Sequence, residues 1–185
     1  MSSPPPPASA APTPSFSDPT SIHTLREVLR TCRVVAIVGL SPQWHRPSFF
    51  VGKYLQEHGY RIVPVNPLVA QEGGQILGEP CYATLQEAAA ALAAQGQRID
   101  MVDCFRKSAD IPPLAEAAVQ IGARCLWMQL GVWSPEAEAH ARAAGLEVVQ
   151  DRCVKIEHAR LFGGLNWAGV NTRVVSAKRP RQLPY

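Results

Sequence analysis

The residues best suited to chemistry lie in the loop GLSPQWHRPS, which starts at Gly39. Gly39 lets the backbone come close to a ligand, Ser41 and Ser48 offer hydroxyls, and the planar guanidinium of Arg46 matches a phosphate group. A helix that begins near Pro47 would direct its free N–H groups at the same place. The loop therefore predicts a phosphate site, and the alternative is an ordinary strand–helix connection with a surface arginine.

The same loop lacks the marks of the common dinucleotide sites. A GxGxxG motif needs three glycines, and this loop contains only Gly39. An NAD site also favours an acidic residue at the end of the second strand, where this chain has Asn66 followed by Pro67. No GxxxxGKS or GxxxxGKT motif occurs, which excludes a P-loop. The sequence thus indicates a phosphate site at a helix N-terminus without the signature of NAD.

Alternating strands and helices must position this loop. Runs of apolar, often β-branched residues predict strands buried on both faces, and capping residues and glycines bound the helices between them. The alternation predicts an α/β fold: a Rossmann-like, doubly wound, mostly parallel sheet of about five strands with helices on both faces. The expected strands are 33–40, 60–65, 100–105, 124–129 and 146–150, and 66–80 is expected to be a loop. The expected helices begin at Asp18 or Thr20 and end at Arg30, begin at Pro47 and end at His58, begin at Thr84 and end at Ala94, begin at Ser108 and end at Gly122, and begin at Ser134 and end at Gly145. A further short helix is expected after Asp151.

The strand ends tell where a ligand should lie. In a doubly wound sheet, ligands bind at the carboxyl ends of the strands, near the point where the strand order reverses. The first four strands are expected to end at Gly39, at Asn66, within 103–107 and within 129–132. We therefore expect these four ends to meet in one crevice.

Composition limits the class of protein. The 185 residues suggest one domain, 19–162, between a disordered Pro-rich tail, 1–18, and a C-terminal extension, 163–185. The net charge of +3 suits an anionic small ligand. Longer basic runs are absent apart from the last few residues, so no nucleic-acid partner is expected. Protein partners and the oligomeric state stay open.

The cysteines and the N-terminus indicate the compartment. The five cysteines form no CxxC pattern, which favours reduced thiols. Residues 1–20 contain seven prolines and no Lys or Arg, unlike a signal peptide. No stretch approaches the roughly 18 apolar residues that span a bilayer. We therefore expect a cytoplasmic protein with no membrane partner.

Several segments together resemble a known family. In chain order they are VVAIVGLSPQWHRPS, YRIVPVNP, DMVDCFRKSADIPP, LWMQLGV and DRCVKIEHARL, and the resemblance extends over about 25–161. They resemble the stand-alone CoA-binding proteins, which are similar to the CoA-binding, nucleotide-binding N-terminal domain of the succinyl-CoA synthetase alpha subunit. Those synthetases also need a phosphorylated histidine and a further domain, and this chain ends soon after the first, so the resemblance does not imply synthetase activity.

The resemblance implies a ligand, CoA or an acyl-CoA, and a set of cofactor-binding residues. Phe105 could instead pack in the core, and Asp103 is expected to cap its loop, because a carboxylate would repel phosphates. The implied contacts are Gly39, Leu40, Ser41, Arg46, Pro47 and Ser48 at the pyrophosphate, Lys53 as a further phosphate contact, Asn66 and Pro67 beside the ribose and its 3′-phosphate, and Val102, Phe105 and Arg106 at the adenine.

Other residues could take part in catalysis. Cys153 lies in DRCVKIEH, near basic residues that could lower its pKa, and could then form a mixed disulfide with the CoA thiol. Alternatively, Lys155, Glu157 and His158 form the polar face of a helix that covers the sheet edge. His45 could be an acid or simply exposed. We find no Ser-His-Asp order and no metal cluster, so no catalytic or metal-binding residue is predicted.

The leading function is therefore CoA or acyl-CoA binding through a helix N-terminus and an arginine, without catalysis. The first alternative is an NADP-dependent oxidoreductase, whose basic residues would accept a 2′-phosphate. The second is a regulatory module that meets a protein partner through the Pro-rich tail or the end of the sheet. Trp127 and Trp133, which flank the fourth strand end, either pack or lie near the pantetheine arm.

Overall fold

The alternating strands and helices form one parallel sheet. We describe residues 21–163 in a computed structural model of the chain. Every neighbouring pair in the sheet is parallel, which confirms the predicted fold class. In spatial order the strands are β2 (Arg61–Val65), β1 (Val34–Val38), β5 (Met101–Cys104), β6 (Cys125–Met128) and β7 (Glu147–Val149).

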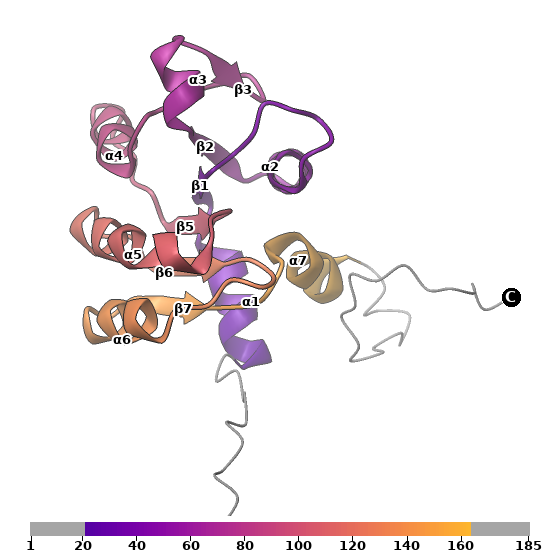
Figure 1. Cartoon of the computed structure of the whole chain (residues 1–185). Coiled ribbons are helices and arrows are strands. Elements are labelled where there is room, and N and C mark those ends of the chain that lie inside the picture. Colours follow the sequence, from indigo (N-terminus) through magenta and orange to yellow (C-terminus); the bar gives the residue numbers. More distant parts are fainter. Residues whose placement is uncertain (1–20, 164–185) are drawn as a thin grey trace, which may run out of the picture.

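Helices cover both faces of the sheet, as Figure 1 shows. Successive side chains of a strand point to opposite faces, so Val35 and Ile37 of β1 enter one core and Ala36 and Val38 enter the other. On the first face lie α1 (Ile22–Thr31), α2 (Pro47–Glu57) and α7 (Val154–Phe162); on the second lie α4 (Leu85–Ala93), α5 (Ile111–Gln120) and α6 (Pro135–Ala143).

The strand order reverses between β1 and β5. The chain moves from β1 to β2 through α2, then crosses back to β5 on the other side of β1. Gly39 follows β1 and Phe105 follows β5, and the Phe105 N–H donates to the carbonyl of Val38 over 2.9 Å. The fold thus places the predicted phosphate loop at the point where such sheets bind ligands.

The segment 66–80, predicted as a loop, contains regular structure. Asn66 caps α3 (Pro67–Gln71), and β3 (Gln75–Ile76) pairs antiparallel with β4 (Glu79–Pro80). The turn of this hairpin holds Leu77 and Gly78 at φ of +57° and +79°. Such a turn usually carries Asn or Gly at its first position, and the leucine there explains why the sequence did not indicate a hairpin.

Two predicted helix starts were wrong. Ser21, not Asp18 or Thr20, caps α1 through a hydrogen bond from the Thr24 N–H. A short 3-10 turn, η1 (Ser108–Asp110), comes before α5, and the Ser108 hydroxyl instead accepts from the N–H of Trp133. The predicted tail 1–18 and the predicted extension 163–185, apart from Gly163, lie outside the described residues.

Other predicted starts are confirmed by their hydrogen bonds. The hydroxyl of Thr84 accepts from the N–H of Glu87 at the start of α4, and that of Ser134 accepts from the N–H of Ala137 at the start of α6. α2 begins at Pro47, as predicted. None of the helices within 21–163 has both the length and the apolar character needed to cross a bilayer.

Candidate functional site

Gly39 sits where the chain leaves β1. Its φ of +85° lies in the left-handed region, which favours glycine. A Cβ atom at this position would lie 2.6 Å from the carbonyl oxygen of Phe105, closer than such atoms approach one another. Both the conformation and the neighbouring backbone therefore require glycine at the switch point.

The serines of the loop keep donors available. The Ser48 Oγ accepts from the N–H of Ser41 over 3.1 Å, and the Ser41 Oγ accepts from the N–H of Gln43 over 3.1 Å. Because each oxygen acts as an acceptor there, its hydroxyl hydrogen can still be donated to a ligand. Within residues 21–163, no side chain caps the start of α2, whose dipole favours an anion at this point.

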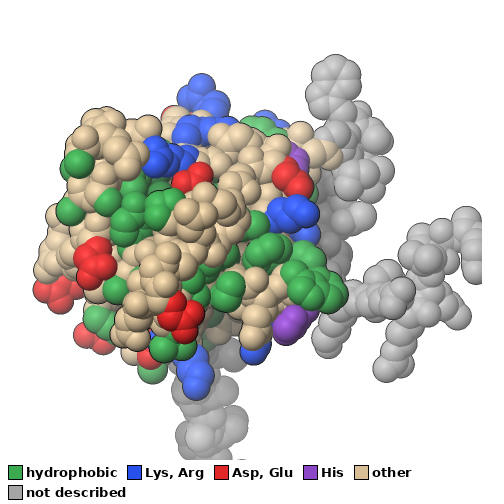
Figure 2. All heavy atoms as spheres, turned by 90° about the horizontal axis from the view of Figure 1, so that it is seen from above, with side chains coloured by type: hydrophobic (Ala, Val, Ile, Leu, Met, Phe, Trp, Pro, Cys, Tyr) green, Lys and Arg blue, Asp and Glu red, His purple; other side chains and the backbone are tan. Residues whose placement is uncertain are grey.

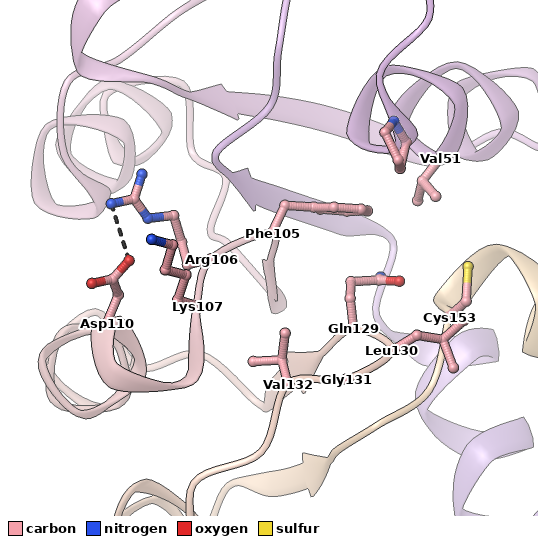
Figure 3. Close-up of a pocket in the computed structure, with 11 residues that line it drawn as sticks. Val51, Phe105, Arg106, Lys107, Asp110, Gln129, Leu130, Gly131, Val132 and Cys153 are labelled. Carbon is pink, nitrogen blue, oxygen red and sulfur yellow. Dashed lines mark ion pairs between the residues drawn. The ribbon is translucent and has the colours of Figure 1, made fainter.

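Two arginines border the site, and they differ in how far their guanidinium groups are paired within the protein. The Nε of Arg46 donates to the Oε1 of Gln43 over 3.1 Å, and none of the other guanidinium donors has a partner among the described residues. The Nη2 of Arg106 lies 3.2 Å from the Oδ2 of Asp110, the ion pair dashed in Figure 3. Arg46 therefore offers more of its charge to a ligand than Arg106 does.

Three adjoining cavities open along the carboxyl ends of the strands. The loop cavity, about 530 Å³, is lined by Gly39, residues 41–43, residues 46–48 and Asn66 among others. The α5 cavity, about 480 Å³, lies between Pro67, α4 and α5. The central cavity, about 1050 Å³, is lined by residues from α2, 105–110, 129–132 and Cys153. Gly39 lines the first two, and Phe105 lines the loop and central cavities, so all three meet at the switch point.

The central cavity is mostly apolar. Figure 3 shows Val51 from α2, Phe105 after β5, and Leu130 and Val132 after β6 around the space, with Gln129 and Cys153 near its α7 side. Phe105 lines this cavity and also packs against the core, and it does not line the α5 cavity. The sequence analysis singled out Phe105 and Cys153 but not Val51, Leu130 or Val132.

The thiol of Cys153 differs from the sequence hypothesis. Burial raises its pKa, and the opposing effect of the Ile156 and Lys155 N–H groups is smaller. The hypothesis of a lowered pKa is therefore wrong, because burial outweighs the nearby positive charge. Cys153 nevertheless lines the central cavity.

A buried carboxyl lies beneath the site. Asp103 on β5 is fully buried, and its Oδ1 accepts from the Nε2 of Gln129 over 2.7 Å. Burial raises the pKa of Asp103 to about 7, against a smaller lowering effect of this hydrogen bond. Asp103 is therefore not seen to cap its loop; its hydrogen bond instead links β5 to Gln129, the residue that follows β6.

Some implied contacts lie away from the cavities. Leu40 and Val102 are fully buried core residues and line none of the three. Lys53 lies on the outer side of α2, where its Nζ is 3.9 Å from the Oε1 of Glu57. Periodicity cannot distinguish a core side chain from a cavity-lining one at the end of a strand.

Asn66 and Pro67 occupy the neighbouring strand end. The Asn66 Oδ1 accepts from the N–H of Leu68, and its Nδ2 donates to the carbonyl of Leu40 over 2.9 Å. Both ends of this amide are therefore engaged within the protein, although Asn66 lines the loop cavity. Pro67, the first residue of α3, lines the α5 cavity.

The residues predicted as the polar face of α7 are buried in part. Glu157 is 1% exposed and pairs with Arg152 and Arg160. His158 is also buried, and its Nδ1 lies 3.0 Å from the hydroxyl of Tyr54. Burial, then the charges of nearby residues, lowers the pKa of His158. The polar-face interpretation is thus wrong for these two residues, because α7 packs against α1 and α2 instead of covering the edge.

The remaining aromatic candidates separate clearly. Trp127 is fully buried, and its Nε1 donates to the carbonyl of Arg152 over 2.7 Å, which favours the packing role. Trp133 is 45% exposed. His45 is exposed, beside the ring of Trp44. The described residues contain no group of three His, Cys, Asp or Glu side chains able to hold a metal ion.

The comparison with protein families agrees with this geometry. The model of a CoA binding domain matches residues 33–159, which include every element of the sheet and the three cavities. The chain belongs to this CoA-binding domain family. The family resemblance stated from the sequence motifs is thereby confirmed.

Several similar proteins match most of this chain, and the matches cover nearly all of their own length. An uncharacterized Bacillus subtilis (strain 168) protein, YneT, is 34% identical over 135 residues, 73% of this chain and 92% of that protein. The solved structure of a Pyrococcus horikoshii OT3 hypothetical protein has 35% identity and a TM-score of 0.69, covering 80% of this chain and 96% of that one. A Thermus thermophilus structure has 32% identity and a TM-score of 0.69, covering 77% and 99%.

Proposed function

We propose that this member of the CoA-binding domain family binds coenzyme A or an acyl-CoA across the three cavities, without a catalytic step of its own. The pyrophosphate would lie in the loop cavity, the adenosine in the α5 cavity beside Pro67, and the pantetheine arm in the central cavity. The observation that carries the proposal is that the most polar of the three cavities, at a helix N-terminus, meets the two less polar cavities at Gly39 and Phe105.

The donors of the loop cavity support a phosphate there. The start of α2, the hydroxyls of Ser41 and Ser48, and the free donors of Arg46 converge on one space. Charge-assisted hydrogen bonds of this kind are the strong ones in phosphate recognition. Arg106 could contribute from the adenosine side by exchanging part of its pairing with Asp110 for a phosphate.

The surroundings support a small-molecule ligand and a reducing compartment. On the face shown in Figure 2, the Lys and Arg side chains are scattered among acidic and apolar ones, unlike the basic stripe of a nucleic-acid site. All five cysteines are free. The proposal therefore includes a cytoplasmic nucleotide-binding domain over 19–162, with no nucleic-acid or membrane partner.

Isothermal titration tests the proposal. We expect CoA and adenosine 3′,5′-bisphosphate to bind the reduced protein, and Arg46→Ala to weaken both about 10-fold or more, because each loses a charge-assisted phosphate contact. Arg98→Ala is the matched control. Arg98 precedes β5, at the opposite end of the sheet, and is equally a surface arginine.

The alternatives predict different titrations. Binding of NADPH without binding of CoA would support the NADP-dependent oxidoreductase instead. If none of CoA, adenosine bisphosphate and NADPH gives a binding heat, both the CoA-binding and the NADP-binding hypotheses are contradicted and a regulatory module is favoured.

A further inference from the structure

A buried carboxylate usually has a partner for each oxygen, and Asp103 does not. Its Oδ1 accepts from Gln129, but its Oδ2 is enclosed and has no hydrogen-bond partner among the described residues. Burying a polar atom without a partner costs free energy, so such a group in a folded protein calls for a reason. Asp103 lies on the central strand β5, one residue before the end of the strand.

The hydrogen bond from Gln129 has a consequence for the other end of its amide. A glutamine amide has an NH₂ donor and a carbonyl acceptor. Since the Asp103 carboxyl takes the NH₂ group, the Oε1 of Gln129 must point elsewhere. No described residue donates to this oxygen, nor is it among the enclosed atoms that lack a partner. Gln129 lines the central cavity, and Figure 3 shows its oxygen directed into the space toward α7.

The surroundings of this oxygen define what it can bind. Figure 3 shows Val51, Leu130 and Cys153 on the side to which this oxygen points, so the nearby walls are mostly apolar. An acceptor at an apolar wall suits a ligand with an apolar body and an occasional N–H donor, and a chain with secondary amides has this composition. The pantetheine arm of CoA contains two secondary amides.

We infer that Asp103 is a positioning residue, which holds Gln129 so that its Oε1 accepts a hydrogen bond from an amide N–H of the pantetheine arm. This inference rests on the proposed function. It adds a contact that contributes to the affinity for the pantetheine arm and is separate from the phosphate site. A proton on the Asp103 Oδ2 would leave Oδ1 free to accept, so either protonation state can hold the amide.

The experiment compares a ligand that has the arm with one that lacks it. CoA and adenosine 3′,5′-bisphosphate are each titrated into the wild type and into Gln129→Leu, Asp103→Leu and Asp103→Asn. Gln120→Leu is the matched control, because Gln120 is an exposed glutamine at the end of α5 that lines none of the three cavities.

We expect Gln129→Leu and Asp103→Leu to weaken CoA about 5- to 10-fold, the value of one hydrogen bond, and to leave the bisphosphate within about twofold of the wild type. Asp103→Asn keeps an oxygen that can accept from Gln129 and should recover most of the CoA affinity. A merely structural role would change both ligands together and would not be rescued by Asn.

Two results would overturn the inference. Unchanged CoA affinity of Gln129→Leu would do so even if Asp103→Leu fails to fold, and so would an equal loss for both ligands. If the wild type binds the bisphosphate in either case, the proposed function survives. If it binds neither ligand, the proposed function fails and this inference fails with it.

Discussion

The loop 39–48 and the α7 cluster, defined as Arg152, Glu157, His158 and Arg160, contain similar side chains in opposite states. Both combine arginine and histidine with polar neighbours near the same sheet. In the loop, Arg46 is exposed and most of its donors are unused. In the α7 cluster, both oxygens of the buried Glu157 are engaged by arginines.

The difference shows which polar groups are available for a ligand. The α7 cluster uses its charges to hold α7, since removing one partner would leave a buried charge uncompensated. The loop leaves hydrogen-bond donors without a protein partner where three cavities meet. An exposed donor costs little free energy in the absence of a ligand, because water can solvate it. The Asp103–Gln129 pair is intermediate, with one end of each side chain engaged and the other not.

The largest effect is expected from breaking the α7 cluster. Glu157→Ala removes the buried carboxylate that Arg152 and Arg160 both contact, and we expect it to lower the free energy of unfolding by about 3–5 kcal/mol in urea titrations. Glu27→Ala breaks an exposed pair with Arg30 and should cost less than about 1 kcal/mol. Equal effects of the two variants would remove the distinction drawn between the regions.

The Asp103–Gln129 pair should make the free energy of unfolding depend on pH. The pKa of Asp103 is about 7 in the folded protein against an ordinary 3.8, so the folded state binds more protons between these values. Its contribution to stability is therefore present below pH 4 and is lost as the pH rises through 7. Asp103→Asn lacks this titration and should gain roughly 2–4 kcal/mol relative to the wild type between pH 4 and 8.

Urea titrations of both proteins from pH 4 to 8 measure this difference. A constant difference across the range would show that Asp103 is ionised in the folded protein throughout, with an ordinary pKa. Other carboxyls titrate in both proteins, so their effects cancel in the comparison.

The switch point should tolerate little change. Gly39→Ala adds a Cβ that meets the Phe105 carbonyl and strains a left-handed residue, and we expect a loss of about 2–3 kcal/mol in stability and weaker CoA binding. Gly122→Ala, at a φ of +68° with open space around its Cβ, should cost only about 1 kcal/mol. Similar losses in urea would mean that the contact with Phe105 adds nothing to the backbone strain.

The smallest expected effect is on the rate of alkylation of Cys153, which lines the central cavity and directly precedes α7. Because burial raises its pKa, we expect iodoacetamide to modify it slowly at pH 7.5 and faster as the pH rises. Saturating CoA should slow the reaction further by occupying the central cavity. Peptide mass spectrometry, with Cys153→Ser as the control, follows this site. Rapid modification at neutral pH would restore the hypothesis of an activated thiol.

Much of the fold and part of the site were predictable because their signals are local. Buried strands appear as continuous apolar runs, and Thr84 and Ser134 mark helix starts through their own hydroxyls. The candidate phosphate loop from Gly39 to Ser48 also follows from neighbouring residues and the end of one strand. The close approach of the Phe105 carbonyl, which requires glycine at position 39, comes from a distant strand. Family motifs in the right order then indicated the ligand class.

What the sequence determined by itself is therefore the succession of elements and the loop at the end of β1. Only the tertiary structure decided that Val102 is core, that Glu157 is enclosed, and that Gln129 is held by Asp103. These facts depend on which elements pack together from distant parts of the chain. Burial and hydrogen-bond partners are properties of that packing, and no local pattern of residue types records them.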